Sequence, residues 1–244
     1  MSETLLLECS NLKFGYGFRA QAEPFSFRLH EGEIVALMGP NGCGKSTLLK
    51  TLAGQIPLID GEITLCGKPL GGRQNETWLP RDLARKLALV RMSGLNPGQM
   101  TVREFVSLGR SPYSNFLDGR SPEDERIVDE ALQLLDLQAY SGRYVSNLSD
   151  GERSRVYLAE AVAQRVSVLL LDEPNAFLDI PWSRKLFRTL QALAEKNRMG
   201  IIVSTHSVEY AETYCHGLMV LEGGKIRMSD AREARANGLL AWTE

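Results

Sequence analysis

The stretch GPNGCGKST, Gly39–Thr47, is rich in glycine and follows the short apolar run Ile34–Met38. Such a run is typical of a strand buried on both faces, and the residues after it, KSTLLKTLAG, have the apolar spacing of a helix. Glycines let the backbone curl so that successive N–H groups converge on phosphate oxygens at the start of a helix. The order of strand, glycine-rich loop and helix therefore predicts a phosphate-binding loop in an α/β protein.

The residues of this loop are expected to have different roles toward a nucleotide. Lys45 is expected to reach the β- and γ-phosphates, and Ser46 to offer its hydroxyl to Mg²⁺. Cys43 lies near the start of the helix, which favours the thiolate, although we expect a passive small residue whose alkylation blocks nucleotide binding. The expected nucleotide-binding positions in the loop are Gly39, Pro40, Asn41, Gly42, Cys43, Gly44, Lys45, Ser46 and Thr47.

A second apolar strand, Val166–Leu171, ends in Asp172 and Glu173. A carboxylate at the end of a buried strand is costly unless it meets a cation or hydrogen-bond donors, so Asp172 is predicted to bind Mg²⁺ directly or through another ligand. Glu173 is placed to polarise an attacking water. Taken alone, the segment could be a strand that merely ends in an acidic turn, but the phosphate-binding loop favours nucleotide hydrolysis.

Strands and helices alternate along much of the chain, as in α/β cores with parallel strands. The first third reads as β-strands and turns, whereas the segment from about Ser93 to Asn147 reads as mostly helical. Within it, Ser121 is a predicted N-cap, with Pro122 at the first helical position and Asp124 completing a capping box. We expect one domain, with a catalytic core and β subdomain at 1–92 and 148–244 and an inserted helical subdomain at 93–147.

Composition argues against several classes of protein. The 28 basic and 30 acidic residues nearly balance, which gives no electrostatic reason to expect nucleic acid as a partner. The four cysteines form no C-x-x-C pair, so neither a zinc site nor a disulfide framework is predicted. The apolar run VLLL is far shorter than the ~20 residues of a membrane span, and the N-terminus lacks a secretory signal. We expect a chain that does not itself cross a membrane.

The turn SNLSDGERSR, Ser146–Arg155, is a candidate second anion site, because a polar turn with a glycine leads into a helix-forming stretch. An aspartate, Asp150, sits within this turn. Either the turn is not an anion site, or the carboxylate is held away from the anion.

In their order along the chain, these motifs resemble those of ATP-binding subunits of ABC transporters over essentially the full length. His206 also follows a buried strand that ends at the same edge as Asp172, which favours a contact with the γ-phosphate. The resemblance implies a P-loop ATPase core with a parallel sheet, an N-terminal antiparallel β subdomain and an inserted helical subdomain. The matching residues are Tyr16 as the adenine-stacking aromatic, Gly39–Thr47 as Walker A, Leu148–Glu152 as the signature, Asp172 and Glu173 as Walker B, Asn175–Asp179 as the D-loop and His206 as the switch histidine.

The resemblance also implies ATP and Mg²⁺ as cofactors and a head-to-tail dimer of two copies of this chain. Ser149 and the Gly151 N–H would face the γ-phosphate on the opposite subunit, with Asp179 among the residues at the nucleotide. Asp150 would then point away from the phosphate, accepting a backbone N–H as an N-cap would. ATP binding would close the dimer, hydrolysis would reopen it, and transmembrane permeases contacting the helical subdomain would receive the motion. The chain would lie peripherally on the cytoplasmic face of the cell membrane.

The helical insertion, including LGRSPY, is similar to that of importers for iron–siderophore, haem and cobalamin complexes, which implies a substrate-binding protein as an indirect partner. Two alternatives remain. One is a soluble ABC ATPase of repair, translation or cofactor assembly, although no coiled coil or second cassette is present in the sequence. The other is a weakly hydrolysing nucleotide-dependent regulator, suggested by Met92 where the family has glutamine and Asp150 where it has glycine; Glu173 and His206 argue against it.

Overall fold

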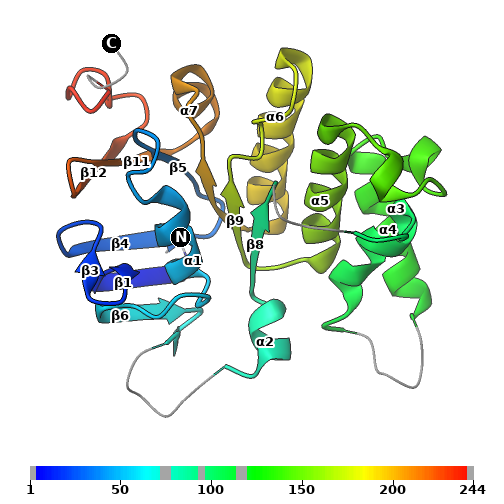
Figure 1. Cartoon of the computed structure of the whole chain (residues 1–244), viewed down its shortest axis with the longest axis horizontal. Helices are drawn as coiled ribbons and strands as arrows, with labels where there is room; N and C mark the ends of the chain where they lie inside the picture. The colour runs from blue at the N-terminus through cyan, green and yellow to red at the C-terminus, as the bar shows by residue number, and fades with distance from the viewer. Residues whose placement is uncertain (1–3, 72–77, 93–96, 114–119, 241–244) are drawn as a thin grey trace.

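The computed structural model describes residues 4–71, 78–92, 97–113 and 120–240. Its centre is a six-stranded sheet in the order β12-β11-β5-β10-β9-β8. The strands β8, β9, β10, β5 and β11 are parallel, and β12 pairs antiparallel to β11 (Figure 1). The strand bounds are β5 Ile34–Met38, β8 Leu87–Arg91, β9 Val168–Asp172, β10 Gly200–Ser204, β11 Gly217–Glu222 and β12 Lys225–Asp230.

Both faces of this sheet are buried, as the continuous apolar runs predict. In β5, Ile34, Ala36 and Met38 point into one core cluster, whereas Val35 and Leu37 point into the other. Helices α6, Ile180–Asn197, and α7, Val208–Tyr214, pack against the sheet on the first side, while α1, Lys45–Leu52, packs on the second and contacts β9. The parallel α/β core is therefore confirmed.

A second, antiparallel sheet lies beside α1, in the order β4-β1-β6-β7 (Figure 1, blue to cyan). Its inner face and α1 share one apolar cluster, which includes Leu7, Leu29 and Leu49. A two-stranded hairpin, β2–β3, follows β1 and contacts α1. The bounds are β1 Leu5–Lys13, β2 Gly15–Tyr16, β3 Arg19–Ala20, β4 Phe25–His30, β6 Asp60–Leu65 and β7 Lys68–Pro69.

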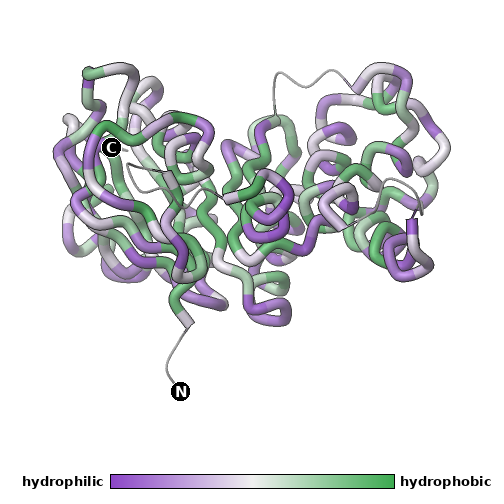
Figure 2. Tube along the Cα trace, turned by 90° about the horizontal axis from the view of Figure 1, so that it is seen from below, coloured by the Kyte–Doolittle hydropathy of each residue, from purple (hydrophilic) through white to green (hydrophobic). Residues whose placement is uncertain are grey.

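A group of helices lies at the other end of the molecule, where α3 and α4 pack on α5 (Figures 1 and 2). Helix α4 begins with the predicted capping box of Ser121 and Asp124, and Asp124 also accepts a 2.8 Å bond from the buried Arg110. Residues 93–96 and 114–119 of the expected helical segment lie outside the described residues. The elements of this group are α3 Val102–Ser107, η1 Leu108–Arg110, α4 Pro122–Leu134, η2 Gln138–Tyr140, η3 Val145–Asn147 and α5 Asp150–Gln164. The short helix α2, Pro80–Ala84, lies apart from them and contacts β8 (Figure 1).

Among the described residues, no helix combines the length and apolarity that a bilayer span needs.

Candidate nucleotide site

The glycine-rich loop joins the buried strand β5 directly to α1, and its backbone requires glycine. Gly39 has φ 144, and a Cβ there would lie 2.2 Å from the carbonyl oxygen of Leu221. Gly44 precedes α1 with φ 116, a left-handed conformation that other residues rarely adopt. The first N–H groups of α1 have no acceptor within the helix, so the loop and the helix start present donors to one anion.

Lys45 is the first residue of α1 and is only 5% exposed. Its ammonium donates hydrogen bonds to the carbonyl oxygens of Gly39, at 2.8 Å, and Pro40, at 3.1 Å. The cation is therefore held over the loop by acceptors that phosphate oxygens can replace. Ser46 is exposed, whereas Thr47 is buried.

The thiol of Cys43 is partly buried within the loop. Burial raises the pKa of its thiol, and this effect exceeds the opposing influences of the Lys45 charge and the nearby backbone N–H groups. The thiol packs against the cluster shared by α1 and the antiparallel sheet. The neutral thiol is therefore favoured at neutral pH, because burial outweighs the preference of a helix start for the thiolate.

The β2–β3 hairpin carries Tyr16, whose side chain is 55% exposed. Because the hairpin contacts α1, this ring belongs to the same side of the molecule as the loop rather than to the core. Gln21 follows the hairpin and packs beside the loop, where its Cβ would lie 3.2 Å from a Cβ placed on Gly44. No feature of the sequence singled out Gln21.

Strand β9 ends at Asp172, Glu173 follows it directly, and a buried serine of β10 bonds to both residues. The Ser204 hydroxyl donates to the Asp172 carboxylate at 2.9 Å and accepts the backbone N–H of Glu173 at 2.8 Å. Ser204 is fully buried, so these two bonds fix the end of β9 against its neighbour. The sequence analysis did not predict this link. The only sign of it in the sequence is the hydroxyl residue, Ser204, that ends the apolar run IIVS.

Glu173 and His206 meet above the ends of β9 and β10. The Nε2 atom of His206 lies 2.9 Å from Oε1 of Glu173. Glu173 has φ 51, an unusual conformation for a non-glycine residue that occurs more often at functional sites. The side chains are 42–43% exposed, so a water and an anion can approach the pair.

The donors near the loop suit a hard cation. Ser46 lies on α1, which contacts β9, the strand that ends in the half-buried Asp172. A hydroxyl and one carboxylate match the preference of Mg²⁺ for a few protein oxygens together with phosphates and waters. In the described part of the chain, no group of three or more His, Cys, Asp and Glu side chains is placed to hold a metal ion.

The signature turn forms the start of α5, which begins at Asp150, well before Val156, the first large apolar residue of the helix. Ser149 is the N-cap, because its hydroxyl accepts the Glu152 N–H at 3.3 Å and the Glu152 carboxylate accepts the Ser149 N–H at 2.8 Å. The Ser149 N–H and then its hydroxyl hold the pKa of Glu152 below its usual range. This capping box explains the early start of the helix.

Asp150 is the first residue of α5, and its exposed carboxylate pairs with the guanidinium of Arg153 one turn later. The expectation that Asp150 itself accepts a backbone N–H as a cap is wrong, because Ser149 already provides the cap. A negative charge in the first turn of a helix is favourable toward the helix dipole, which accounts for aspartate here.

The D-loop lies against the signature helix within the same chain. A Cβ on Gly151 would lie 3.1 Å from the carbonyl oxygen of Phe177. Asp179 is the N-cap of α6 and accepts the Trp182 N–H at 2.9 Å, and Asn175 accepts a 3.4 Å bond from the Thr205 hydroxyl. The D-loop therefore links the signature helix to the segment that carries His206.

Met92 directly follows β8 and is half-buried against the core, while Gln99 is exposed. Arg91, the residue before Met92, pairs in register with Asp172 where β8 and β9 run side by side. The position that carries Met92 is thus adjacent to the Asp172 end of the sheet.

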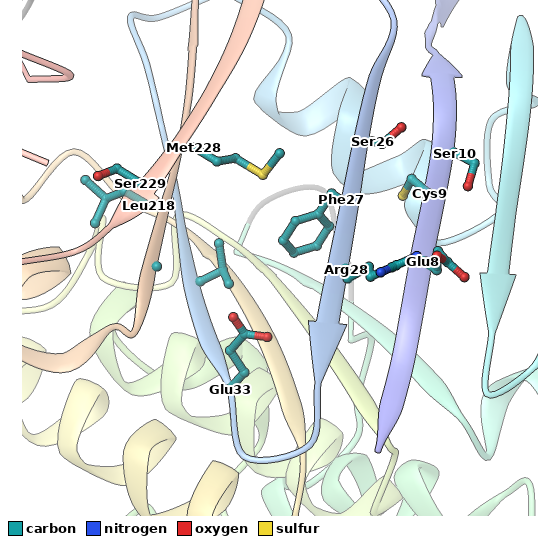
Figure 3. A pocket seen from close by; sticks show the side chains of 12 residues that line it. Glu8, Cys9, Ser10, Ser26, Phe27, Arg28, Glu33, Leu218, Met228 and Ser229 are labelled. Atoms are coloured by element: carbon teal, nitrogen blue, oxygen red, sulfur yellow. Dashed lines mark hydrogen bonds and ion pairs between the residues drawn. The ribbon is translucent and has the colours of Figure 1, made fainter. Parts of the chain in front are cut away.

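A separate cavity of about 620 Å³ lies between β4 and the β11–β12 hairpin (Figure 3). Phe27 and Met228 face each other across it, and Glu33 lies at its lower end in the view of Figure 3. None of the expected nucleotide-binding residues lines it, so it is not part of the candidate site.

Comparisons with known proteins agree with this geometry. The family profile described as ABC transporter matches residues 22–176. The petrobactin import ATP-binding protein of Bacillus anthracis is 35% identical over 93% of this chain and 82% of its own length. The hemin import ATP-binding protein of Streptomyces coelicolor is 34% identical over 97% of this chain and 82% of its own.

A solved structure described as an inward-facing conformation of a metal-chelate type ABC transporter aligns with a TM-score of 0.81 and 27% identity. The alignment covers 97% of this chain and 88% of that one. A dimeric bacterial ABC transporter cassette, at 24% identity and a TM-score of 0.79, shares the fold over 93% of this chain and 99% of its own. The chain therefore belongs to the ABC transporter family, and it is an ATP-binding ATPase of that family.

Proposed function

We propose that this chain is the ATP-hydrolysing subunit of an importer for an iron–siderophore, haem or cobalamin type of chelate. The observation that carries the ATPase part is the contact of Glu173 with His206, 2.9 Å apart and beside Asp172. The relatives named for petrobactin and hemin import, with their coverage of almost the whole chain, support the cargo class.

Within one site, each group has a distinct task. The loop N–H groups and Lys45 bind the β- and γ-phosphates, and Tyr16 stacks on adenine. Ser46 and Asp172 hold Mg²⁺, which neutralises phosphate charge when bound. Glu173 accepts a proton from the attacking water, and His206 orients the Glu173 carboxylate toward it.

The second half of the site comes from another copy of the chain. Ser149 and Gly151 lie at the start of α5, where Ser149 is exposed and Gly151 is half-buried. In a head-to-tail dimer this turn covers the γ-phosphate bound by the partner, and Asp179 lies at the same interface. ATP then joins the two copies, and its hydrolysis releases them.

The helical elements between 93 and 147 form the inserted subdomain that contacts transmembrane permeases, and the rest of the chain forms the catalytic core. In this proposal the chain lies peripherally on the cytoplasmic face of the cell membrane. A substrate-binding protein on the opposite face delivers the chelate to the permeases. The cargo is therefore selected by those other subunits.

The test is the substitution Glu173→Gln with Mg-free and Mg-bound ATP. The glutamine keeps the shape of the side chain and cannot accept the proton, so hydrolysis stops and an ATP-bound dimer accumulates. Light scattering measures the dimer, and phosphate release measures hydrolysis. A variant that stays monomeric with ATP would overturn the dimer mechanism, and one that still hydrolyses ATP at the wild-type rate would overturn the role of Glu173.

A further inference from the structure

The signature turn of this chain carries two carboxylates, Asp150 and Glu152, beside the hydroxyl of Ser149. Glu152 is committed to the capping box, where its carboxylate accepts both the N–H and the hydroxyl of Ser149 at 2.8 Å. Asp150 has no role in this cap. Under the proposed function the turn covers a γ-phosphate, so a carboxylate without a cation at Asp150 would oppose closure of the dimer.

The guanidinium of Arg153 supplies the missing positive charge. It donates to the Asp150 carboxylate, and in the described part of the chain this carboxylate pairs with no other side chain. The side chains of Arg153 and Asp150 are 31% and 65% exposed, and an ion pair in such contact with water adds little to the stability of a fold. The pair is therefore better explained by the charge that it cancels than by the stability that it adds.

The pair also fixes the side of α5 on which the carboxylate lies. Asp150, Arg153 and Tyr157 follow one another at spacings of three and four residues, so they share one face of the helix. Burial raises the pKa of the Tyr157 phenol, the nearby charge of Arg153 lowers it, and that of Asp150 raises it. Tyr157 packs on Phe105 of α3, with ring centroids 5.4 Å apart, whereas Gly151 faces the D-loop. The carboxylate thus lies on the α3 side of α5.

We propose that Arg153 is a positioning residue for ATP-driven dimerisation. It holds the Asp150 carboxylate on the α3 side of α5 and cancels its charge beside the γ-phosphate that Ser149 and the Gly151 N–H cover. The inference rests on the proposed function and adds to it a residue that acts through Asp150 rather than on the nucleotide. Without Arg153, the unpaired carboxylate lies close to a second anion, and like charges at close range repel each other.

The experiment measures ATP-driven dimerisation of isolated chains that carry Glu173→Gln, the change that blocks hydrolysis. In this parent, Arg153→Gln should raise the dimer dissociation constant about tenfold or more, because each ATP then faces an unpaired carboxylate. The control Arg126→Gln breaks a matched ion pair, since Arg126 bonds to Glu123 three residues earlier, in the first turn of α4. This control should dimerise like the parent. Light scattering over a range of chain concentrations gives the dissociation constants.

Two companion variants separate positioning from a merely structural role. Asp150→Asn combined with Arg153→Gln removes both charges and should restore dimerisation to within about twofold of the parent. Arg153→Lys keeps the positive charge and should dimerise better than Arg153→Gln. In about 1 M salt the deficit of Arg153→Gln should shrink, since screening weakens repulsion. A double variant as deficient as Arg153→Gln would mean that Arg153 acts on the phosphate or the fold directly, and it would overturn the proposal.

The remaining outcomes distinguish this inference from the proposed function. Equal dissociation constants for Arg153→Gln and the parent would overturn the inference and leave the dimer mechanism intact. A Glu173→Gln parent that does not dimerise with ATP would overturn the dimer mechanism and the inference with it. Thermal unfolding shows whether each variant is folded, and Arg153→Met, which keeps the aliphatic part of the side chain, takes the place of the glutamine variant if that variant is not.

Discussion

The Nε2 atom of His206 lies 2.9 Å from Oε1 of Glu173, and the two side chains come from loops that follow neighbouring parallel strands. Ser204 fixes the relative position of these strand ends by bonding both Asp172 and the Glu173 backbone. The orientation of Glu173, the expected base, therefore depends on Ser204 and His206, which lie next to it in space but far from it in the sequence.

Replacing His206 by alanine is expected to lower kcat for ATP hydrolysis about 100-fold, because an unoriented carboxylate is a poorer general base. The KM for ATP should change little, since the loop and Lys45 bind the phosphates. Steady-state phosphate release measures both constants. The control His30→Ala, at the end of β4, should keep wild-type kcat; an equal loss in both variants would contradict the assigned role.

Replacing Asp150 by glycine is expected to leave ATP-driven dimerisation unchanged, because the carboxylate pairs with Arg153 and does not belong to the cap. The free energy of unfolding should fall by about 1 kcal/mol, since a helix loses a favourable first-turn charge and gains a glycine. Light scattering with Mg-free ATP and urea unfolding measure the two effects. A large gain in dimerisation would show that the carboxylate faces the phosphate.

Replacing Met92 by glutamine should raise the basal ATPase rate or leave it unchanged, because an amide oxygen is a better Mg²⁺ or water ligand than a thioether. The half-buried position makes the amide costly, so we expect stability to fall by about 1 kcal/mol. Phosphate release and urea unfolding test these points, with Gln99→Ala as an exposed control. A collapse of ATPase activity would mean that the methionine is required.

The strands and the loop could be predicted because their signals are local. A short all-apolar run such as Ile34–Met38 requires burial on both faces, and the glycines of 39–44 require backbone that only glycine adopts easily. The capping box at Ser121 was likewise readable from three residues. The first residue of α5 could not be predicted in this way, because the regularly spaced apolar residues of the helix begin well after its N-cap, Ser149.

Features that depend on distant segments could not be read from the sequence. Ser204 bonds across to the end of β9, and Gln21 packs beside Gly44, so both contacts exist only in the folded chain. Cys43 shows the same limit, because its local position favours a thiolate whereas tertiary burial raises its pKa. Glu160 is another example, because acidic residues on helices usually face water, whereas burial in the folded chain raises the pKa of this carboxyl.

The raised pKa of Glu160 has a measurable consequence for stability. Its folded value of about 7 exceeds its ordinary value of 4.5, so between these values the folded chain keeps a proton that the unfolded chain has released. The associated stability is present below pH 4.5 and is lost as the pH rises through about 7.

Glu160→Gln removes this titration, and it should therefore be more stable than the wild type at pH 8 by about 1–3 kcal/mol, with little difference at pH 4.5. Urea unfolding of both chains at the two pH values measures the change, and Glu195→Gln, at an exposed position, should follow the wild type. If Glu160→Gln also followed the wild type at both pH values, the carboxyl would be ionised in the folded chain, and its surroundings would have to supply a cation or water that compensates for its burial.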